Sequence, residues 1–94
     1  SNYRAAIISL DNVLIDYPEI ENREEIYYLI LESSYFLAIN SIQSKKEKRL
    51  NMTIEYYNQF NDNFPESNYK VEVDKIFDIT KTTIDQLKLT NDEI

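Results

Sequence analysis

Two aromatic-proline steps constrain the fold of this chain more than any other feature. Tyr17-Pro18 and Phe64-Pro65 lie 47 residues apart, and each one follows an apolar-striped segment and precedes another. A proline inside a helix loses a backbone hydrogen bond and its ring crowds the preceding turn, so each step predicts a helix end. Shifted by the same 47 residues, the chain pairs apolar positions at helical spacing, among them Ile7 with Ile54, Leu10 with Tyr57, Ile26 with Val73 and Ile30 with Phe77. The sequence therefore predicts two helical hairpins, the second repeating the first.

Composition narrows the range of functions. The 94 residues fit a single small domain, 1–94. Cysteine and histidine are absent, which excludes disulfides, thiolate metal sites and the commonest general base. Glycine is absent as well, so a glycine-rich phosphate-binding loop cannot be built. We therefore expect a protein that is not an enzyme, with no cofactor, and we name no catalytic, cofactor-binding or metal-ligating residue.

Charge and hydropathy restrict the partners. Seventeen acidic against ten basic side chains give a net charge of -7, which repels polyanions and argues against a nucleic-acid partner. No apolar run approaches the ~20 residues of a membrane-spanning helix. The opening Ser1-Asn2 is typical of residues left by tag removal, so we expect a fragment of a longer protein.

Apolar residues at three-four spacing predict four helices. We place them at residues 3–17, 23–42, 45–63 and 68–89, with a polar tail over 90–94. The predicted inward stripe of the first helix is Ala6, Ile7, Leu10, Val13, Leu14 and Tyr17, and that of the fourth is Tyr69, Val73, Ile76, Phe77, Thr80, Ile84 and Leu87. Asn22 with Glu25, and Ser44 with Glu47, predict capping boxes at the starts of the second and third helices. The apolar surface of the second helix is wider than one stripe, which predicts contacts on two sides.

Four helices with short connections are compatible with a closed up-down bundle or with an open two-hairpin segment of a solenoid. The internal repeat favours the solenoid, because a closed bundle has no reason to reproduce the same punctuation in its two halves. We therefore predict an all-α fold of two antiparallel helical hairpins, arranged as a tetratricopeptide-like right-handed solenoid fragment.

Asn40 and Ser41 lie at the end of the predicted second helix. Without glycine, this helix end needs another way to satisfy its last carbonyl groups. We predict that the Asn40 amide and the Ser41 hydroxyl bond to those carbonyls.

The only concentrated positive charge comes from Lys45, Lys46, Lys48 and Arg49, at the start of the third helix. The helix dipole disfavours cations there by roughly 0.3 to 1 kcal/mol each at low salt, so local stability does not explain them. A docking patch for an acidic protein partner would explain them. The alternative is a solvated helix start.

Tyrosine is abundant enough to suggest interface anchors, because it combines a large apolar area with a polar tip. Tyr28 and Tyr56 are the two whose spacing allows them to face outward, and we name them as candidate partner-binding residues. The alternative is that both belong to the packing between helices, as Tyr57 does.

Three segments together carry a resemblance. They are Ser34-Tyr35-Phe36-Leu37-Ala38-Ile39-Asn40-Ser41, Ser44-Lys45-Lys46-Glu47-Lys48-Arg49-Leu50, and Tyr56-Tyr57 through Phe64-Pro65-Glu66-Ser67-Asn68-Tyr69. They resemble the C-terminal part of the BamD-type outer-membrane assembly lipoproteins, above all those of Bacteroidetes. The resemblance implies tetratricopeptide-like hairpins and a scaffold in a complex that inserts β-barrels. It also implies a periplasmic location on the outer membrane, held by an N-terminal lipid outside these 94 residues. The 47-residue offset exceeds the ~34 residues of a standard repeat.

Two functions follow. The first is a protein-protein interaction scaffold that binds other proteins of a barrel-assembly complex. The alternative is a stand-alone four-helix dimerisation or regulatory domain that binds a cytoplasmic partner through its wide second helix. A fragment cut from a repeat array would expose apolar flanks, so self-association is also expected to be possible.

Overall fold

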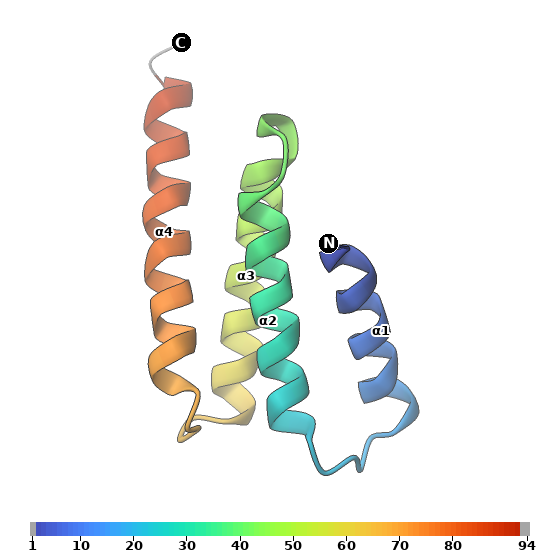
Figure 1. Cartoon of the computed structure of the whole chain (residues 1–94). Coiled ribbons are helices and arrows are strands. Elements are labelled where there is room, and N and C mark those ends of the chain that lie inside the picture. Colours follow the sequence, from blue (N-terminus) through green and yellow to red (C-terminus); the bar gives the residue numbers. More distant parts are fainter. Residues whose placement is uncertain (1, 93–94) are drawn as a thin grey trace.

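The computed structural model describes residues 2–92 and contains four helices (Figure 1). They are α1 (Tyr3–Asp16), α2 (Arg23–Ile39), α3 (Gln43–Asn63) and α4 (Lys70–Asp92). Consecutive helices run in opposite directions, and each packs against the next one along the chain. The predicted all-α fold of two helical hairpins is therefore confirmed.

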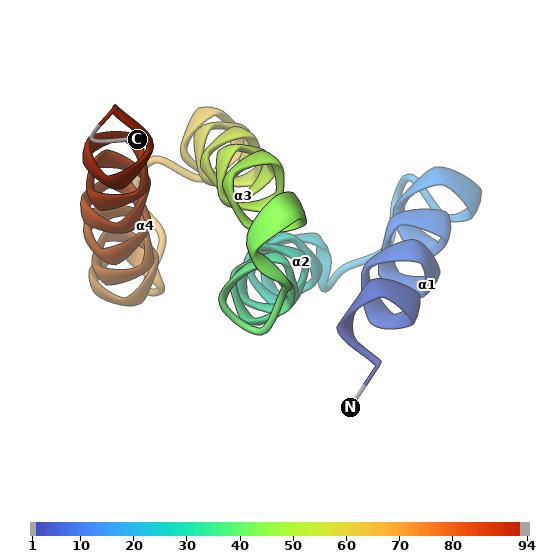
Figure 2. The same ribbon diagram turned by 90° about the horizontal axis from the view of Figure 1, so that it is seen from above.

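The helices form an open row. Viewed from above, α1 and α4 lie at opposite ends of the row, with α2 and α3 between them (Figure 2). Besides its neighbours in sequence, α2 contacts α4, whereas the backbone of α1 comes close only to α2 among the described residues. The molecule is elongated, with extents of 49 × 27 × 18 Å. This arrangement matches the open alternative and not the closed bundle.

The internal repeat is present in the backbone. The first helix of each hairpin ends at Asp16 or Asn63, and the second begins at Arg23 or Lys70, so both boundaries recur at the same 47-residue offset. Both hairpins therefore have connections of equal length.

The two turns also share one conformation. Tyr17 has φ -129° and ψ 70°, and Phe64 has φ -136° and ψ 62°. In each turn an N–H group three residues later donates to the carbonyl of that aromatic residue, Ile20 to Tyr17 at 3.0 Å and Ser67 to Phe64 at 3.2 Å. The proline ring drives the residue before it out of the helical region of backbone angles, which explains why the chain leaves the helix at both turns.

The core lies between α2, α3 and α4. Two clusters of buried side chains each take one residue from each of these helices, Leu31, Phe60 and Val73 in one, and Ala38, Leu50 and Ile84 in the other. The predicted inward stripe of the last helix is confirmed by its buried members, Val73, Thr80 and Ile84. α1 contributes no fully buried side chain.

The central helix is α2. None of residues 26–39 is exposed, because α1, α3 and α4 cover it on different sides. The wide apolar surface predicted contacts on two sides, and the structure shows three. Ser34 and Thr53 are buried between α2 and α3, where their hydroxyl oxygens lie 2.9 Å apart in a hydrogen bond.

The end of α2 is capped as the sequence predicts. The Asn40 side-chain amide donates to the carbonyl of Phe36 at 2.8 Å, and the Ser41 hydroxyl donates to that of Leu37 at 2.5 Å. The Ser41 bond satisfies a carbonyl that the ending helix leaves free, whereas the Phe36 carbonyl also accepts from the Asn40 backbone N–H at 3.2 Å. The two side-chain bonds also end α2 at Ile39, earlier than the predicted residue 42.

Other boundaries differ from the predictions by one to three residues, which is the usual scatter at helix ends. α1 ends at Asp16 instead of residue 17, α3 begins at Gln43 instead of 45, and α4 begins at Lys70 instead of 68. The polar tail predicted over 90–94 is helical as far as Asp92, since no glycine or proline stops the helix there. Residues 93 and 94 lie outside the described residues.

Both predicted capping boxes are wrong. Asn22 precedes α2 without a side-chain bond to the helix, because its φ of -91° and ψ of 28° depart from the extended conformation of a capping residue. Ile42, not Ser44, precedes α3, so Ser44 lies inside the first turn. Tyr17, predicted in the inward stripe of the first helix, is 64% exposed, because α1 packs against a single helix, α2, among the described residues.

Candidate functional site

A groove of about 480 Å³ lies between α1 and α3, with α2 behind it. Figure 2 shows α2 set back between the other two helices. The groove is lined by Arg4, Ile7 and Ile8 from α1, Ser34 and Leu37 from α2, and Lys45, Lys48, Arg49, Met52 and Tyr56 from α3. Its α3 residues recur at three-four spacing, so a single face of that helix forms one wall.

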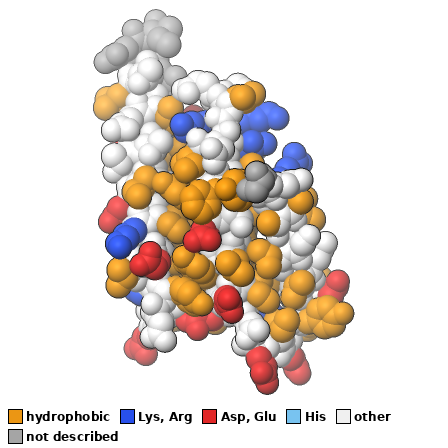
Figure 3. Space-filling view, viewed as in Figure 1, with side chains coloured by type: hydrophobic (Ala, Val, Ile, Leu, Met, Phe, Trp, Pro, Cys, Tyr) orange, Lys and Arg blue, Asp and Glu red, His pale blue; other side chains and the backbone are white. Residues whose placement is uncertain are grey.

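One end of the groove is basic. Its lining contains the cations Arg4, Lys45, Lys48 and Arg49 and, within the described part of the chain, no carboxylate. The ion pairs found among residues 2–90 both lie within α4, so none of these four cations has an acidic partner within 4.0 Å there. Figure 3 shows lysine and arginine side chains gathered at the upper right, and acidic ones mostly toward the lower end.

Arg49 is held in place by the end of α2. Its Nη1 donates to the Ser41 hydroxyl oxygen at 2.7 Å, and that hydroxyl in turn donates to the Leu37 carbonyl. Ser41 therefore caps α2 and also orients a guanidinium of the groove. The sequence predicts the first role but gives no signal for the second, which depends on α3 folding back beside α2.

The middle of the groove is apolar. Ile8 on α1 is 53% exposed and Met52 on α3 is 45% exposed, and Ile7 and Leu37 are half-buried beside them. Large apolar side chains left open to solvent in a concave surface are typical of interaction sites.

Tyr56 lies at the other end of the lined part of α3. Burial is the main cause that raises the pKa of its phenol, and the nearby carboxylates Asp11 and Glu55 raise it further. The hydroxyl therefore stays neutral well above physiological pH and can donate or accept a hydrogen bond there.

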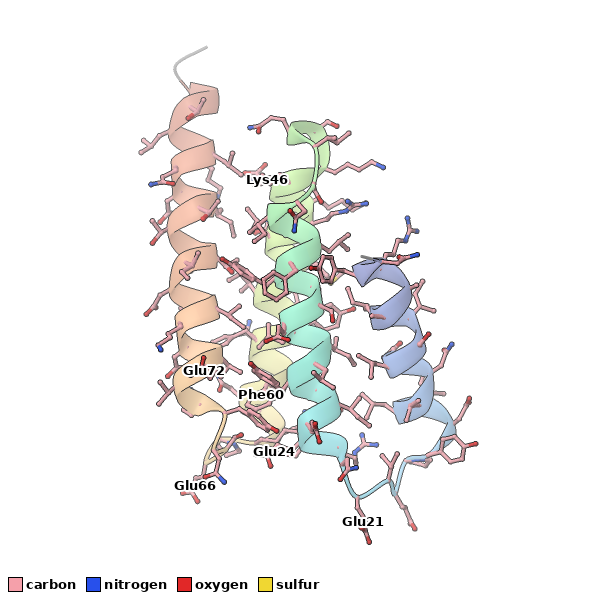
Figure 4. The ribbon with its side chains drawn as sticks, viewed as in Figure 1. Glu21, Glu24, Lys46, Phe60, Glu66 and Glu72 are labelled. Atoms are coloured by element: carbon pink, nitrogen blue, oxygen red, sulfur yellow. The ribbon has the colours of Figure 1, made fainter. Side chains whose placement is uncertain are left out.

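The structure brings together four of the six residues named from the sequence. Lys45, Lys48, Arg49 and Tyr56 all line the groove. Lys46 is half-buried and does not line it, because one residue along a helix turns the side chain by about 100°. In Figure 4 Lys46 lies near the opposite end of the molecule from Glu21, Glu24 and Glu66.

Tyr28 lies apart from the groove. Its ring stacks on that of Tyr69 with centroids 4.4 Å apart, and its hydroxyl donates to Glu32 at 2.9 Å. Burial, followed by the hydrogen bond to Glu32, raises the pKa of Tyr28 to about 12. These contacts join α2 to the chain entering α4, so the structure places Tyr28 in packing between helices.

Sequence reasoning missed the α1 wall of the groove. Arg4 and Ile8 belong to the site only because α1 lies across from α3, more than 40 residues later in the chain. One signal was available, since Ile8 is a large apolar residue outside the inward stripe of its helix.

Two features are absent from the described residues, a membrane-spanning helix and a cluster of metal ligands. No helix there has the length and apolar character needed to cross a membrane. The same part of the chain holds no group of three or more potential metal ligands placed to bind an ion.

Comparisons with protein-family models, curated proteins and solved structures give no match for this chain. The structure shows a four-helix all-α domain of two sequentially packed hairpins. The affiliation with BamD-type lipoproteins stays a prediction.

Proposed function

We propose that this protein is a non-enzymatic scaffold that holds a segment of another protein in the groove between α1 and α3. The observation that carries the proposal is the groove itself, where exposed Ile8 and Met52 adjoin cations without an acidic partner among the described side chains. Neither feature stabilises the folded chain, since exposed apolar area favours burial and clustered like charges repel. A bound segment would relieve both costs.

A second step of the proposal concerns the assembly in which the scaffold acts. We propose a role in the insertion of outer-membrane β-barrels, at the periplasmic face of the membrane, as in BamD-type lipoproteins. The support is the resemblance of the segment from Asn40 to Leu50 and of the Phe64-Pro65-Glu66-Ser67 turn. The first segment spans the connection between α2 and α3 and the first two turns of α3, including the Ser41 contact to Arg49. The second forms part of the turn between α3 and α4.

The alternative of a stand-alone dimerisation or regulatory domain has less support. It relied on the apolar surface of the second helix as the interface. That surface is taken up inside the chain, because α1, α3 and α4 cover α2 and leave none of residues 26–39 exposed.

Site-specific photo-crosslinking in the full-length protein, within its own cells, tests the proposal. A photoreactive amino acid at Met52 reports on the groove, and one at Val71 on α4, which is 64% exposed and outside the groove, serves as the control. We expect Met52 to capture a defined protein that Val71 does not.

The identity of the captured protein tests the second step. A large outer-membrane barrel component would support the role in barrel assembly. Capture of cytosolic proteins alone would contradict that role while leaving the scaffold function standing. Equal capture from Met52 and Val71 would contradict the scaffold function itself.

A further inference from the structure

The basic end of the groove is not neutralised by the protein that carries it. Arg4 reaches it from α1, and Lys45, Lys48 and Arg49 reach it from the first two turns of α3. The helix dipole disfavours Arg4 in the first turn of α1 and Lys45 in the first turn of α3, and the four like charges repel one another. The chain as a whole carries a net charge of -7, so carboxylates are plentiful, yet none of those described pairs with these cations.

The apolar part of the groove lies directly beside the basic end. Met52 follows Lys48 by one helical turn on α3, and Ile8 follows Arg4 by one turn on α1. A ligand that contacts both parts must therefore carry negative charge and apolar groups within a few ångströms of each other.

The length of the groove limits the size of that ligand. Its α3 residues run from Lys45 to Tyr56, which is about 16 Å along the axis at 1.5 Å per residue. This length fits about five residues of extended chain or about three turns of helix.

We propose that the groove recognises a short acidic, amphipathic segment of a partner protein, with carboxylates at the basic end and apolar side chains between Ile8 and Met52. This names the ligand of the groove and so rests on the proposed function. Charge complementarity selects it. A nucleic acid carries negative charge along its whole length, so it would also meet the carboxylates Asp11 and Glu55 beside Tyr56, whereas a peptide can place its carboxylates at the basic end alone. A flat membrane surface does not enter a groove.

The four cations have different roles. Lys45, Lys48 and Arg4 are exposed and without an ion pair among the described side chains, so they attract an acidic segment over a distance that salt screens. Arg49 is fixed by Ser41, so its guanidinium is already oriented for a carboxylate before binding.

Titration with three fluorescent peptides of about 12 residues, long enough for three helical turns, tests the proposal. All carry leucine at three-four spacing, and the remaining positions are glutamate in the first, glutamine in the second and lysine in the third. We expect the glutamate peptide to bind by fluorescence anisotropy, the glutamine peptide about tenfold more weakly, and the lysine peptide not at all.

Charge reversal in the protein provides the matching variants. We expect Lys45→Glu with Lys48→Glu to weaken binding of the glutamate peptide at least about tenfold and to reduce its salt dependence. Lys81→Glu with Lys88→Glu changes the net charge equally at exposed positions of α4 and is expected to leave binding within about twofold. If the first pair fails to fold by circular dichroism, Lys45→Gln with Lys48→Gln provides the same comparison.

A second pair of variants isolates the oriented guanidinium. Ser41→Ala removes the contact to Arg49, whereas Asn40→Ala removes a cap from the same helix end without touching it. We expect Ser41→Ala to weaken binding of the glutamate peptide about threefold more than Asn40→Ala does, and to leave the salt dependence of binding unchanged. Equal effects of the two variants would overturn the role of Arg49.

The other outcomes are distinguishable. Equal binding of the glutamate and glutamine peptides, lost in Ile8→Gln with Met52→Gln, would overturn the acidic ligand and leave the scaffold function in place. Absence of binding by any peptide would overturn both. Either a single-stranded oligonucleotide or anionic vesicles are then added to the bound glutamate peptide as competitors. If either one displaces the peptide, the groove belongs to that competitor, and the proposal of a partner segment is overturned. Dimerisation in light scattering that displaces the peptide would likewise assign the groove to a second copy of the chain.

Discussion

The two hairpins have the same turn but different surroundings. Tyr17 and Phe64 occupy equivalent positions with nearly equal backbone angles, yet Tyr17 is 64% exposed. Phe64 packs against Phe60 and against Tyr27 of the other hairpin, with ring centroids 5.6 and 5.3 Å apart. Local sequence therefore sets the shape of each turn, while burial depends on whether another helix lies beside it.

The second helices of the hairpins differ in the same way. Leu31 and Ala38 on α2 are completely buried, and the residues 47 positions later on α4 are the exposed carboxylates Asp78 and Asp85. α2 has helices on three sides, whereas α4 contacts, among the described residues, only α2 and α3. The repeat thus keeps its turn and the two helix boundaries beside the turn. Its apolar positions become charged on the side of α4 that no described helix covers.

The largest expected difference between the hairpins is at Phe60 and Val13, which occupy equivalent positions. Phe60 is completely buried among three helices, so Phe60→Ala should lower the free energy of unfolding by about 3 to 5 kcal/mol. Val13 is half-buried on α1, so Val13→Ala should cost about 1 kcal/mol. Urea denaturation followed by circular dichroism measures both values.

If Phe60→Ala does not fold, Phe60→Leu keeps most of the side-chain volume and should cost about 1 to 1.5 kcal/mol. Equal losses at Phe60 and Val13 would show that α1 is packed as tightly as α3, and the contrast between the hairpins would fail.

The aromatic residues of the turns provide a smaller difference. Phe64→Ala removes packing against two rings and should lower the free energy of unfolding by about 1.5 to 3 kcal/mol. Tyr17→Ala should cost less than about 0.5 kcal/mol, because that ring is mostly exposed. A costly Tyr17→Ala in the same denaturation assay would mean that the ring has a partner in solution.

The contact between the hairpins rests in part on the hydroxyl pair of Ser34 and Thr53. Thr53 also donates to the carbonyl of Arg49 at 3.1 Å, so its oxygen accepts the bond from Ser34. Thr53→Val leaves the buried Ser34 hydroxyl without this acceptor and should cost about 1 to 2 kcal/mol, more than Ser34→Ala. The double variant should cost less than the sum of the two single variants, and strict additivity in thermal and urea denaturation would contradict the coupling.

The features that could be predicted from the sequence are local ones. Pro18 and Pro65 end helices because of the proline ring itself, whatever the neighbouring helices are. Val73, Thr80 and Ile84 share one face of α4 because of helical spacing alone. The end of α2 was placed too late because no proline or glycine marks it. The exposure of Tyr17 was missed because it depends on the neighbours of α1, which the repeat pattern does not describe.

Only the α3 wall of the groove could be predicted from the sequence, because the opposite wall depends on how the helices pack. Lys45, Lys48 and Arg49 share one face of a helix, which spacing alone shows. Arg4 and Ile8 join them through tertiary packing, and the bond from Arg49 to Ser41 requires α2 and α3 to fold back on each other. A cluster of charges within one helix can therefore be predicted from the sequence. The residues that another helix contributes to the same site cannot.

The smallest expected difference concerns the first residue of each second helix. Arg23 and Lys70 are equivalent, and each contacts the side chain four residues later, Tyr27 at 3.4 Å and Asp74 at 3.0 Å respectively. The Tyr57 hydroxyl, which donates to Asp74 at 2.7 Å, and the Lys70 ammonium hold the pKa of the Asp74 carboxyl below its ordinary value. The second hairpin should therefore have an acid-sensitive contact where the first has none.

The sign of this effect follows from the lowered pKa. The contact stabilises the folded state above the unfolded-state pKa of Asp74, about 4, and this stability is lost as the pH falls through the lower folded-state value. Asp74→Asn should be less stable than the natural protein at neutral pH, and the gap should narrow below about pH 4. Tyr27→Phe, the matched change in the first hairpin, should give a gap that stays constant over the same acid range. Urea midpoints measured across this range would contradict the contrast if both gaps changed alike with pH.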